Sequence, residues 1–317
     1  MSIAVLGATG HLGRAAIDHL LARGVAPSEL IAAGRAVEKL DGLRERGVDV
    51  RAVDYADAAS IDAALAGSRV VLLVSGSEIG QRVAQHAAVI AAAERVGAQR
   101  LVYTSIVNAL DSQHLLAPEH AETERMLAAS SLAVTVLRNN WYIENFAADV
   151  ATAAETGVVA SGAGEGRIAS ATRDEYAEAA AVALLDDDHA GQTYELTGPE
   201  AWNHLELASA LSELLGREVV YDALDPEEQR AQLTSAGLDD ATAGFIVGLD
   251  ANTRAGELAA VSADLEQLLG RRPRDLRAQL ATLISAGPSG RLAGSALPTA
   301  EQPTVSRSRS APRSRRR

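Results

Sequence analysis

The amino-acid sequence predicts an α/β fold built on a doubly wound parallel sheet, followed by a smaller mixed α/β lobe. Three observations carry this prediction. Short apolar runs alternate with longer helical patterns over the first 140 residues, and most of these runs are apolar on both faces. A glycine-rich turn follows the first run directly. Strands buried on both faces and separated by helices are typical of right-handed βαβ crossovers.

The first six strands are expected where Val, Ile and Leu concentrate in short runs. These runs are residues 3–7, 30–34, 48–54, 70–75, 100–105 and 133–139. Helical patterns lie between them, most clearly at residues 12–23, 79–96 and 119–129. Together these elements make residues 1–140 one sheet-forming unit.

After residue 140 the spacing of the elements changes. Short strands are expected at 158–161, 193–197 and 218–223, and helices at 174–185 and 204–215. Residues 226–286 are expected to be mainly helical, with breaks at Gly237, Gly248 and Gly270. We interpret residues 141–286 as a smaller substrate-side lobe, some of whose elements can pack back on the sheet.

Composition excludes several kinds of chemistry. The chain has 317 residues, 29 basic and 42 acidic, with a net charge of −13, no cysteine and one lysine, Lys39. The absence of cysteine excludes disulfides, thiolate metal sites, iron–sulfur clusters and a cysteine nucleophile. Neither a secretory signal nor a long apolar span is evident, so we expect a cytoplasmic protein without membrane insertion.

The charge is concentrated at the C-terminus. Residues 288–317 hold seven Arg and one Glu, a net +6, which leaves −19 on the rest of the chain. We expect residues 287–317 to be a disordered basic tail, most simply a solvated extension. An acidic body argues against nucleic-acid binding through the folded part, although the tail could contact acidic surfaces.

The glycine-rich turn is the strongest local motif. It follows the first expected strand and opens the first expected helix, which is the context a dinucleotide-binding loop requires. One glycine permits the tight turn, the next lets the backbone approach a pyrophosphate, and the third lets the helix pack close to the sheet. The expected loop residues are Gly7, Ala8, Thr9, Gly10, His11, Leu12 and Gly13. Residues 1–140 are therefore predicted to be a Rossmann-type NAD(P)-binding domain.

The end of the second expected strand favours NADPH over NADH. An NAD-specific site usually has an acid there, but this chain has Arg35, whose guanidinium suits a 2′-phosphate, and Lys39 as a helper. Two further strand ends should line the same crevice. They supply Asp54 and Tyr55 near adenine, and Ser75, Gly76 and Ser77 at a turn that contacts the cofactor. Each of these two groups could equally be an ordinary turn.

The usual proton donor of short-chain dehydrogenases is missing. Its Tyr-x-x-x-Lys pair cannot form, because Lys39 is the only lysine and Arg35 stands four residues before it. His120 and Glu124 lie one helical turn apart and could relay a proton, but a solvated polar face is the favoured interpretation. Reduction of a ketone is therefore disfavoured. A quinone is a better acceptor, since it forms a stable hydroquinone anion that water can protonate.

A substrate and nicotinamide pocket is expected after the sixth strand. Three of the chain's ten aromatic residues lie within residues 138–146, interleaved with amide side chains. A hinge packed by its aromatics is the alternative. The expected residues are Asn139, Asn140, Trp141, Tyr142, Ile143, Glu144 and Asn145, with Thr104 and Ser105 fixing the nicotinamide. Arg173 is expected either to cap the cofactor or to pair with neighbours of Asp174. Trp141, Tyr142 and Asn145 would shape the acceptor pocket.

Five motifs in order carry a family resemblance: GATGHLG, LLVSGSEIGQR, YTS, LRNNWYIENF and GRIASATRDEYA. The sequence resembles the atypical short-chain dehydrogenase family with NmrA-like members, and more narrowly the NADPH-dependent quinone oxidoreductases of the bacterial cytoplasm. The resemblance implies NADPH as hydride donor, a quinone as acceptor, and neither flavin nor metal. It assigns residues 7–12 to the pyrophosphate, Arg35 to the 2′-phosphate, 75–77 to a cofactor-contacting turn, and 139–144 to the nicotinamide and quinone.

Three questions stay open at this point: turnover against sensing, the oligomeric state and the physiological quinone. Relatives in this family include redox sensors that bind NADP(H) without turnover, and only the aromatic–amide pocket argues against that function here. A carbonyl or isoflavone-type reductase would need a lysine in the catalytic helix, which the chain lacks. The oligomeric state, including a homodimer, and the physiological quinone are not determined by the sequence.

Overall fold

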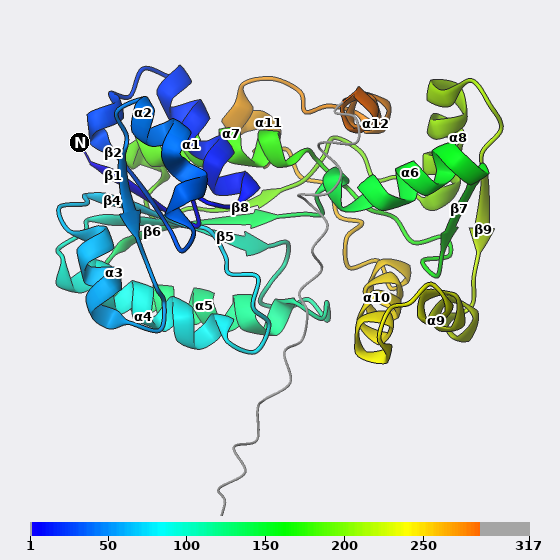
Figure 1. Ribbon diagram of the computed structural model, residues 1–317, viewed down its shortest axis with the longest axis horizontal. Helices are drawn as coiled ribbons and strands as arrows, with labels where there is room; N and C mark the ends of the chain where they lie inside the picture. Colours follow the sequence, from blue (N-terminus) through cyan, green and yellow to red (C-terminus); the bar gives the residue numbers. More distant parts are fainter. Residues whose placement is uncertain (1, 286–317) are drawn as a thin grey trace, which may run out of the picture.

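The computed structural model describes residues 2–285, and its centre is a seven-stranded parallel sheet in the order β3-β2-β1-β4-β5-β6-β8 (Figure 1). The strands are β1 (Ile3–Leu6), β2 (Leu30–Gly34), β3 (Asp49–Ala52), β4 (Val70–Leu73), β5 (Arg100–Ile106), β6 (Ala133–Asn139) and β8 (Thr193–Leu196). The strand order reverses between β1 and β4, and a ligand crevice forms at the carboxyl ends of strands at such a switch point. The tail expected at 287–317 lies outside the described residues.

Helices cover both faces of this sheet. One face carries α1 (His11–Ala22), α7 (Arg173–Leu185) and α11 (Asp264–Leu269), and the other carries α3 (Ala58–Leu65), α4 (Arg82–Arg95) and α5 (Ala117–Ala128). The short α2 (Asp41–Glu45) leads into β3. Among residues 2–285, no helix combines the length and apolarity needed to cross a membrane.

The alternation of side chains along β4 explains its unbroken apolar sequence. Val70 and Leu72 pack in the core beneath α1 and α7, whereas Val71 and Leu73 pack in the core beneath α3 and α4. Because successive side chains point to opposite faces, every side chain of a strand buried on both sides faces an apolar core. The prediction of a parallel sheet with two covered faces is confirmed.

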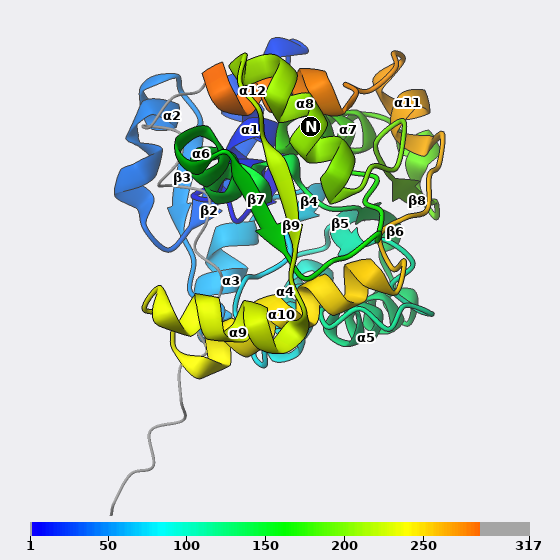
Figure 2. The ribbon, with the colours of Figure 1, turned by 90° about the vertical axis from the view of Figure 1, so that its right-hand side faces the viewer.

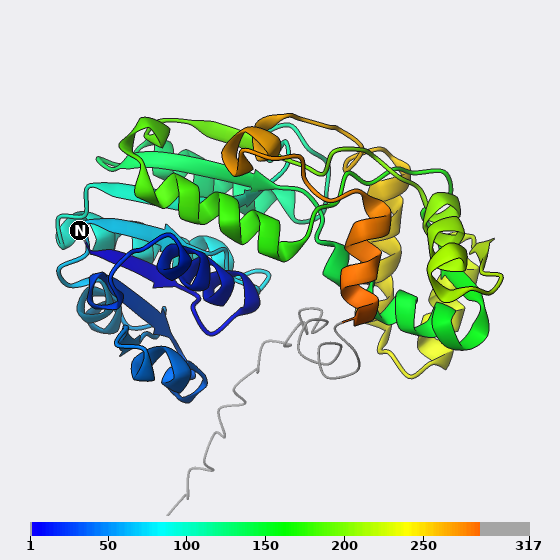
Figure 3. The same ribbon diagram turned by 90° about the horizontal axis from the view of Figure 1, so that it is seen from above.

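A smaller unit stands beyond the carboxyl ends of the strands (Figures 1 and 3). It contains α6 (Ala147–Thr156), β7 (Val158–Ser161), α8 (His204–Leu215), β9 (Val220–Ala223), α9 (Pro226–Ser235), α10 (Asp240–Arg254) and α12 (Leu276–Ser285). Figure 2 shows the parallel β7–β9 pair between α8 and α12 on one side and α9 and α10 on the other. A separate apolar core around Phe146, Trp202 and Leu211 holds this unit together.

The second half of the chain alternates between the two units. After β6 it enters the smaller unit, returns to the sheet for α7 and β8, leaves again for α8 to α10, and returns once more for α11. Residues 141–285 are thus shared between the sheet and the smaller unit, and β8 extends the sheet beyond β6.

One expected helix break is wrong. The breaks at Gly237 and Gly270 are confirmed, since both have positive φ (96° and 66°) and stand at helix ends. Helix α10, however, runs through Gly248 without interruption. A Cβ at this position would lie 2.6 Å from Cδ1 of Leu115, so the glycine allows a close approach between α10 and the loop before α5.

Candidate cofactor site

The loop between β1 and α1 packs against the neighbouring strand β2. Gly7 has φ +81°, a conformation that strains other residues, and the Ala8 amide donates to the Ala33 carbonyl on β2 at 3.0 Å. A Cβ on Gly13 would lie 2.5 Å from the carbonyl oxygen of Gly7. Both glycines are therefore required by the path of the backbone, as the sequence predicts.

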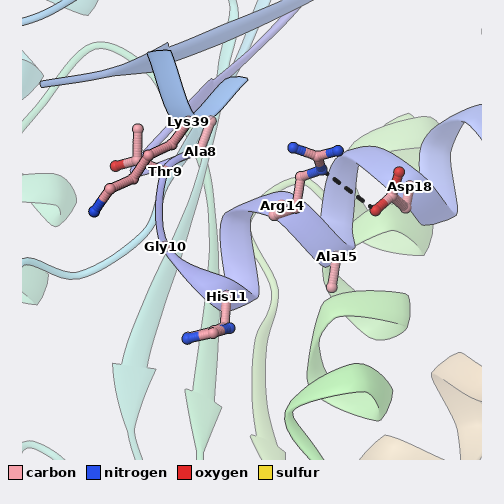
Figure 4. Close-up of a pocket in the computed structure, with 8 residues that line it drawn as sticks. All are labelled: Ala8, Thr9, Gly10, His11, Arg14, Ala15, Asp18 and Lys39. Carbon is pink, nitrogen blue, oxygen red and sulfur yellow. Dashed lines mark ion pairs between the residues drawn. The ribbon is translucent and has the colours of Figure 1, made fainter. Parts of the chain in front are cut away.

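This loop and the start of α1 form a pocket of about 240 Å³ (Figure 4). The residue before α1 is Gly10, which has no side chain to accept from the first-turn amides. Helix N-termini of this kind attract anions. Lys39 adds positive charge to this field, whereas Arg14 forms an ion pair with Asp18 at 3.6 Å (Figure 4). The lining residues are Ala8, Thr9, Gly10, His11, Arg14, Ala15, Asp18 and Lys39. The structure thus brings Lys39 to the glycine loop, although it stands 26 positions after Gly13 in the sequence.

Arg35 follows β2 directly and is 72% exposed, but its guanidinium is not free. Its Nη1 donates to Oε1 of Glu78 at 2.5 Å. The other carboxylate oxygen of Glu78 accepts from Nε2 of Gln85 at 2.6 Å. The Gln85 hydrogen bond, with help from Arg35, holds the pKa of Glu78 below its ordinary value. Sequence reasoning missed Glu78, although it directly follows the expected turn 75–77.

Asp54 and Tyr55 lie near Arg35 at the end of the neighbouring strand β3. Oδ1 of Asp54 accepts from the Ala56 amide at 2.9 Å, which uses part of the carboxylate in its own turn. The Tyr55 ring packs against the core beneath α3 and α4, and this burial raises its pKa despite the opposing charge of Arg35. Asp54 therefore stabilises its own turn and Tyr55 packs on the core. A contact of either residue with adenine stays a prediction.

Buried side chains clamp the loop between β4 and α4, which contains Ser75, Gly76 and Ser77. The Ser75 amide donates to Oγ1 of Thr104 at 2.9 Å, and the Gly76 amide donates to Nε2 of His86 at 3.1 Å. The carbonyl of the same residue, Gly76, accepts from Nε of Arg82 at 2.8 Å. Thr104 thus supports the turn from β5.

The far end of the same loop is held from α5. Glu119 accepts from the Gly80 amide at 2.9 Å and forms an ion pair with Arg82 at 3.1 Å. Arg82 is only 5% exposed and His86 is fully buried. These clamping residues were not predicted, because in the sequence they read as polar positions on ordinary helices.

The hydrogen bonds around His86 define its tautomer. Thr123 donates its hydroxyl to the Glu119 carbonyl, so it accepts from Nδ1–H of His86 at 3.0 Å. Nε2 is then unprotonated and accepts from Gly76. Burial, helped by the positive charge of Arg82, lowers the pKa of His86 to about 3. The imidazole is a neutral acceptor at physiological pH.

This neutral histidine should make folding stability depend on pH. Between about pH 6.5 and about 3 the unfolded chain binds a proton at His86 that the folded protein does not. Stability from this site is complete above pH 6.5 and is lost as the pH falls, by about 1.4 kcal/mol per pH unit. Urea unfolding between pH 5 and pH 7 should show a smaller pH dependence for His86→Gln, which keeps an acceptor but does not titrate. Equal slopes for the two proteins would contradict this account.

The expectation of a solvated face at His120 and Glu124 is wrong. Both residues are buried, at 5% and 7% exposure. Nδ1 of His120 lies 2.8 Å from the Tyr103 hydroxyl, and Glu124 pairs with Arg138 at 2.6 Å. Each therefore has its own structural partner. The Ser105 hydroxyl donates to Glu124 at 2.6 Å, which revises its expected role at the nicotinamide.

The segment after β6 meets the start of α7. Arg173 lies over the Tyr142 ring, 5.2 Å from its centroid, and the Arg173 amide donates to both oxygens of Glu144 at 3.0 Å. Burial raises the pKa of Glu144, partly opposed by Arg173. Asn139 donates from Nδ2 to the Tyr142 hydroxyl at 3.2 Å, while its buried Oδ1 has no partner within the described residues. The structure thus joins four predicted site residues from two distant segments.

The same segment revises two other predicted contacts. Asn140 uses both ends of its side chain internally, because Oδ1 accepts from the Trp141 amide at 2.7 Å and Nδ2 donates to the Leu258 carbonyl at 3.1 Å. Ile143 is completely buried in the core of the smaller unit. These two residues connect the sheet to the smaller unit. Trp141 stays partly exposed beside His114, their ring centroids 5.6 Å apart, and Asn145 is also partly exposed.

The glycine loop at a helix N-terminus, at the switch point of a parallel sheet, defines a dinucleotide-binding protein of the Rossmann type. The model of the NmrA-like family matches residues 1–267, and the chain belongs to this family. The chain is 42% identical over 268 residues to quinone oxidoreductase 2 of Escherichia coli (strain K12), covering 84% of this chain and 93% of that protein. The chain is also 29% identical to the NAD(P)H azoreductase of Xenophilus azovorans, and this match covers 86% of this chain and 94% of that protein.

Solved structures agree with these sequence matches. The crystal structure of the E. coli NADPH-dependent quinone oxidoreductase in complex with NADPH aligns with a TM-score of 0.85 and 41% identity, over 89% of this chain and 99% of that chain. The Citrobacter sp. triphenylmethane reductase in complex with NADP(H) aligns with a TM-score of 0.85 and 35% identity, over 89% and 100% of the two chains. The predicted resemblance to the NmrA-like family is confirmed.

Proposed function

We propose that this protein is an NADPH-dependent oxidoreductase that transfers a hydride to a quinone. The observation that carries the proposal is Arg35 at the end of β2, directly after Gly34, where an added Cβ would lie 2.5 Å from the side chain of Thr9 in the glycine loop. The pocket at this loop also contains Lys39. An NAD-specific site usually presents an acid at this strand end, whereas a guanidinium complements a 2′-phosphate in charge and geometry. The E. coli quinone oxidoreductase and the Citrobacter reductase, both solved with NADPH or NADP(H), support this assignment.

The residues present fit this cofactor. The first-turn amides of α1 and the backbone of Gly10 would hold the pyrophosphate, and Arg35 and Lys39 would hold the 2′-phosphate. At the other end, the unpartnered Oδ1 of Asn139 is suited to accept from a carboxamide, once the side chain shifts enough to expose it. NADPH supplies the hydride when it is bound.

The acceptor side relies on shape and orientation. Trp141, Tyr142 and Asn145 would bound a flat conjugated ring, with the Tyr142 ring fixed by Arg173 and Asn139. Proximity and orientation can carry most of such a reaction. A quinone that receives a hydride becomes a hydroquinone anion, which water can protonate, so the lack of a Tyr–Lys donor pair is consistent with this acceptor.

The 2′-phosphate assignment predicts the effect of Arg35→Ala. Loss of one charge-assisted contact should weaken NADPH binding by about 1.5–3 kcal/mol, or roughly 10- to 150-fold, and should barely affect NADH. Binding of both cofactors can be measured by quenching of tryptophan fluorescence. Equal losses for NADPH and NADH would refute the role of Arg35.

Turnover provides the test of the whole proposal. Purified protein should oxidise NADPH much faster with 1,4-benzoquinone than without it, as followed by NADPH absorbance. Tight NADP(H) binding without any quinone-dependent oxidation would overturn the proposal and would instead favour an NmrA-like redox sensor.

A further inference from the structure

The Arg35–Glu78 ion pair spans the carboxyl end of β1. Arg35 follows β2, Glu78 lies in the loop after β4, and β1 is the strand between them in the sheet. The strands on either side of β1 are about 10 Å apart at typical sheet spacing. The pair therefore closes over the strand that leads into the glycine loop, where the adenosine part of a dinucleotide would lie.

Glu78 is held in this position. Gln85 on α4 donates to its second oxygen at 2.6 Å, and Gln85 also packs 3.2 Å from where a Cβ on Gly76 would be. The loop that carries Glu78 is in turn fixed by His86 and Arg82. The carboxylate is one-third exposed, so the ion pair itself contributes little to stability. The position of Glu78 beside Arg35, the arginine that follows β2, is what bears on cofactor recognition.

We propose that Glu78 is a specificity-determining residue that competes with the 2′-phosphate for Arg35 and so limits the preference for phosphorylated cofactors. A 2′-phosphate adds roughly −1.5 to −2 charges beside Arg35 and must displace Glu78 from the guanidinium in order to pair with it. A cofactor without this phosphate leaves the ion pair intact. Glu78 therefore weakens the binding only of ligands that carry the 2′-phosphate. This inference rests on the proposed NADPH site, but not on quinone turnover.

The test uses two ligands that differ only in the 2′-phosphate: adenosine 2′,5′-bisphosphate and AMP, titrated calorimetrically into the full-length protein. Glu78→Gln should bind the bisphosphate about three- to tenfold more tightly, with less than about a twofold change for AMP. Glu122→Gln is the matched control, because Glu122 is an exposed glutamate paired with an arginine, Arg125, on α5. It should leave both affinities unchanged.

A double-mutant cycle separates this inference from the cofactor assignment. In an Arg35→Ala background, Glu78→Gln should no longer strengthen bisphosphate binding, because the competition has been removed. An unchanged or weaker bisphosphate affinity in Glu78→Gln, or a gain that persists without Arg35, would overturn the role of Glu78. If Arg35→Ala alone leaves bisphosphate binding intact, the 2′-phosphate assignment itself is wrong.

Discussion

Replacement of Arg138 by methionine is expected to lower the free energy of unfolding by about 3–5 kcal/mol. The guanidinium is only 13% exposed and lies between two carboxylates, 2.6 Å from Glu124 and 2.7 Å from Glu195. Burial alone would lower the pKa of Arg138, but the hydrogen bonds to Glu124 and Glu195, together with their charges, raise it above its ordinary value. Without the cation, the buried Glu124 keeps only the hydroxyl of Ser105 as a partner among the contacts described above.

Urea unfolding at pH 7 measures this effect. Arg125→Met is the matched control, since Arg125 is 60% exposed and forms an exposed ion pair with Glu122. Its change should stay within about 1 kcal/mol. Adding Glu124→Gln to Arg138→Met should recover part of the loss, because the unpaired charge is removed. A loss below about 1 kcal/mol for Arg138→Met would show that these carboxylates do not depend on it.

The ion pairs of Arg138 also explain how the end of β6 is held. Glu124 comes from α5 and Glu195 from β8, so Arg138 joins a helix and the outermost strand to the residue just before Asn139. A partly folded edge would therefore disturb the predicted nicotinamide segment. We expect Arg138→Met to affect stability first and cofactor binding only through this loss.

Local signals in the sequence were enough to predict the strands and the glycine loop. Runs such as residues 70–73 are apolar on both faces because two helical layers cover the sheet. The residue types alone therefore indicate this burial. The position of Arg35 directly after the second strand was also predictable, whereas its role at a 2′-phosphate stays a prediction. The return of β8 to the sheet was not specified by pattern, because it depends on how the intervening helices pack.

The polar contacts of the site could not be predicted, because their partners are distant in sequence. Glu78 meets Arg35 across 43 positions, and His86 meets Thr123 across 37. On a helix, a polar residue that faces a buried loop has the same spacing as one that faces water. For this reason the sequence pattern predicts a solvated face at His120 and Glu124, although tertiary packing buries both of them.

Replacement of Gly13 by alanine is expected to weaken NADPH binding by about 100-fold and to destabilise the fold by about 3 kcal/mol, the upper end of the range for overpacking. An added Cβ would lie 2.5 Å from the oxygen and 2.8 Å from the carbon of the Gly7 carbonyl. The obstacle is backbone, so no side chain can rotate away. Relief requires α1 to move from the glycine loop, which would misplace the amides that are proposed to hold the pyrophosphate.

Gly42→Ala provides the matched control for this prediction. Gly42 is also a helical glycine, and a Cβ there would meet only the end of the Arg14 side chain at an ordinary 3.6 Å. Alanine should be neutral or stabilising at this position by up to about 1 kcal/mol, from helix propensity alone. Fluorescence titration with NADPH and urea unfolding of both variants measure the contrast. If Gly13→Ala binds NADPH as tightly as Gly42→Ala, close contact between α1 and the loop is not what shapes the phosphate site.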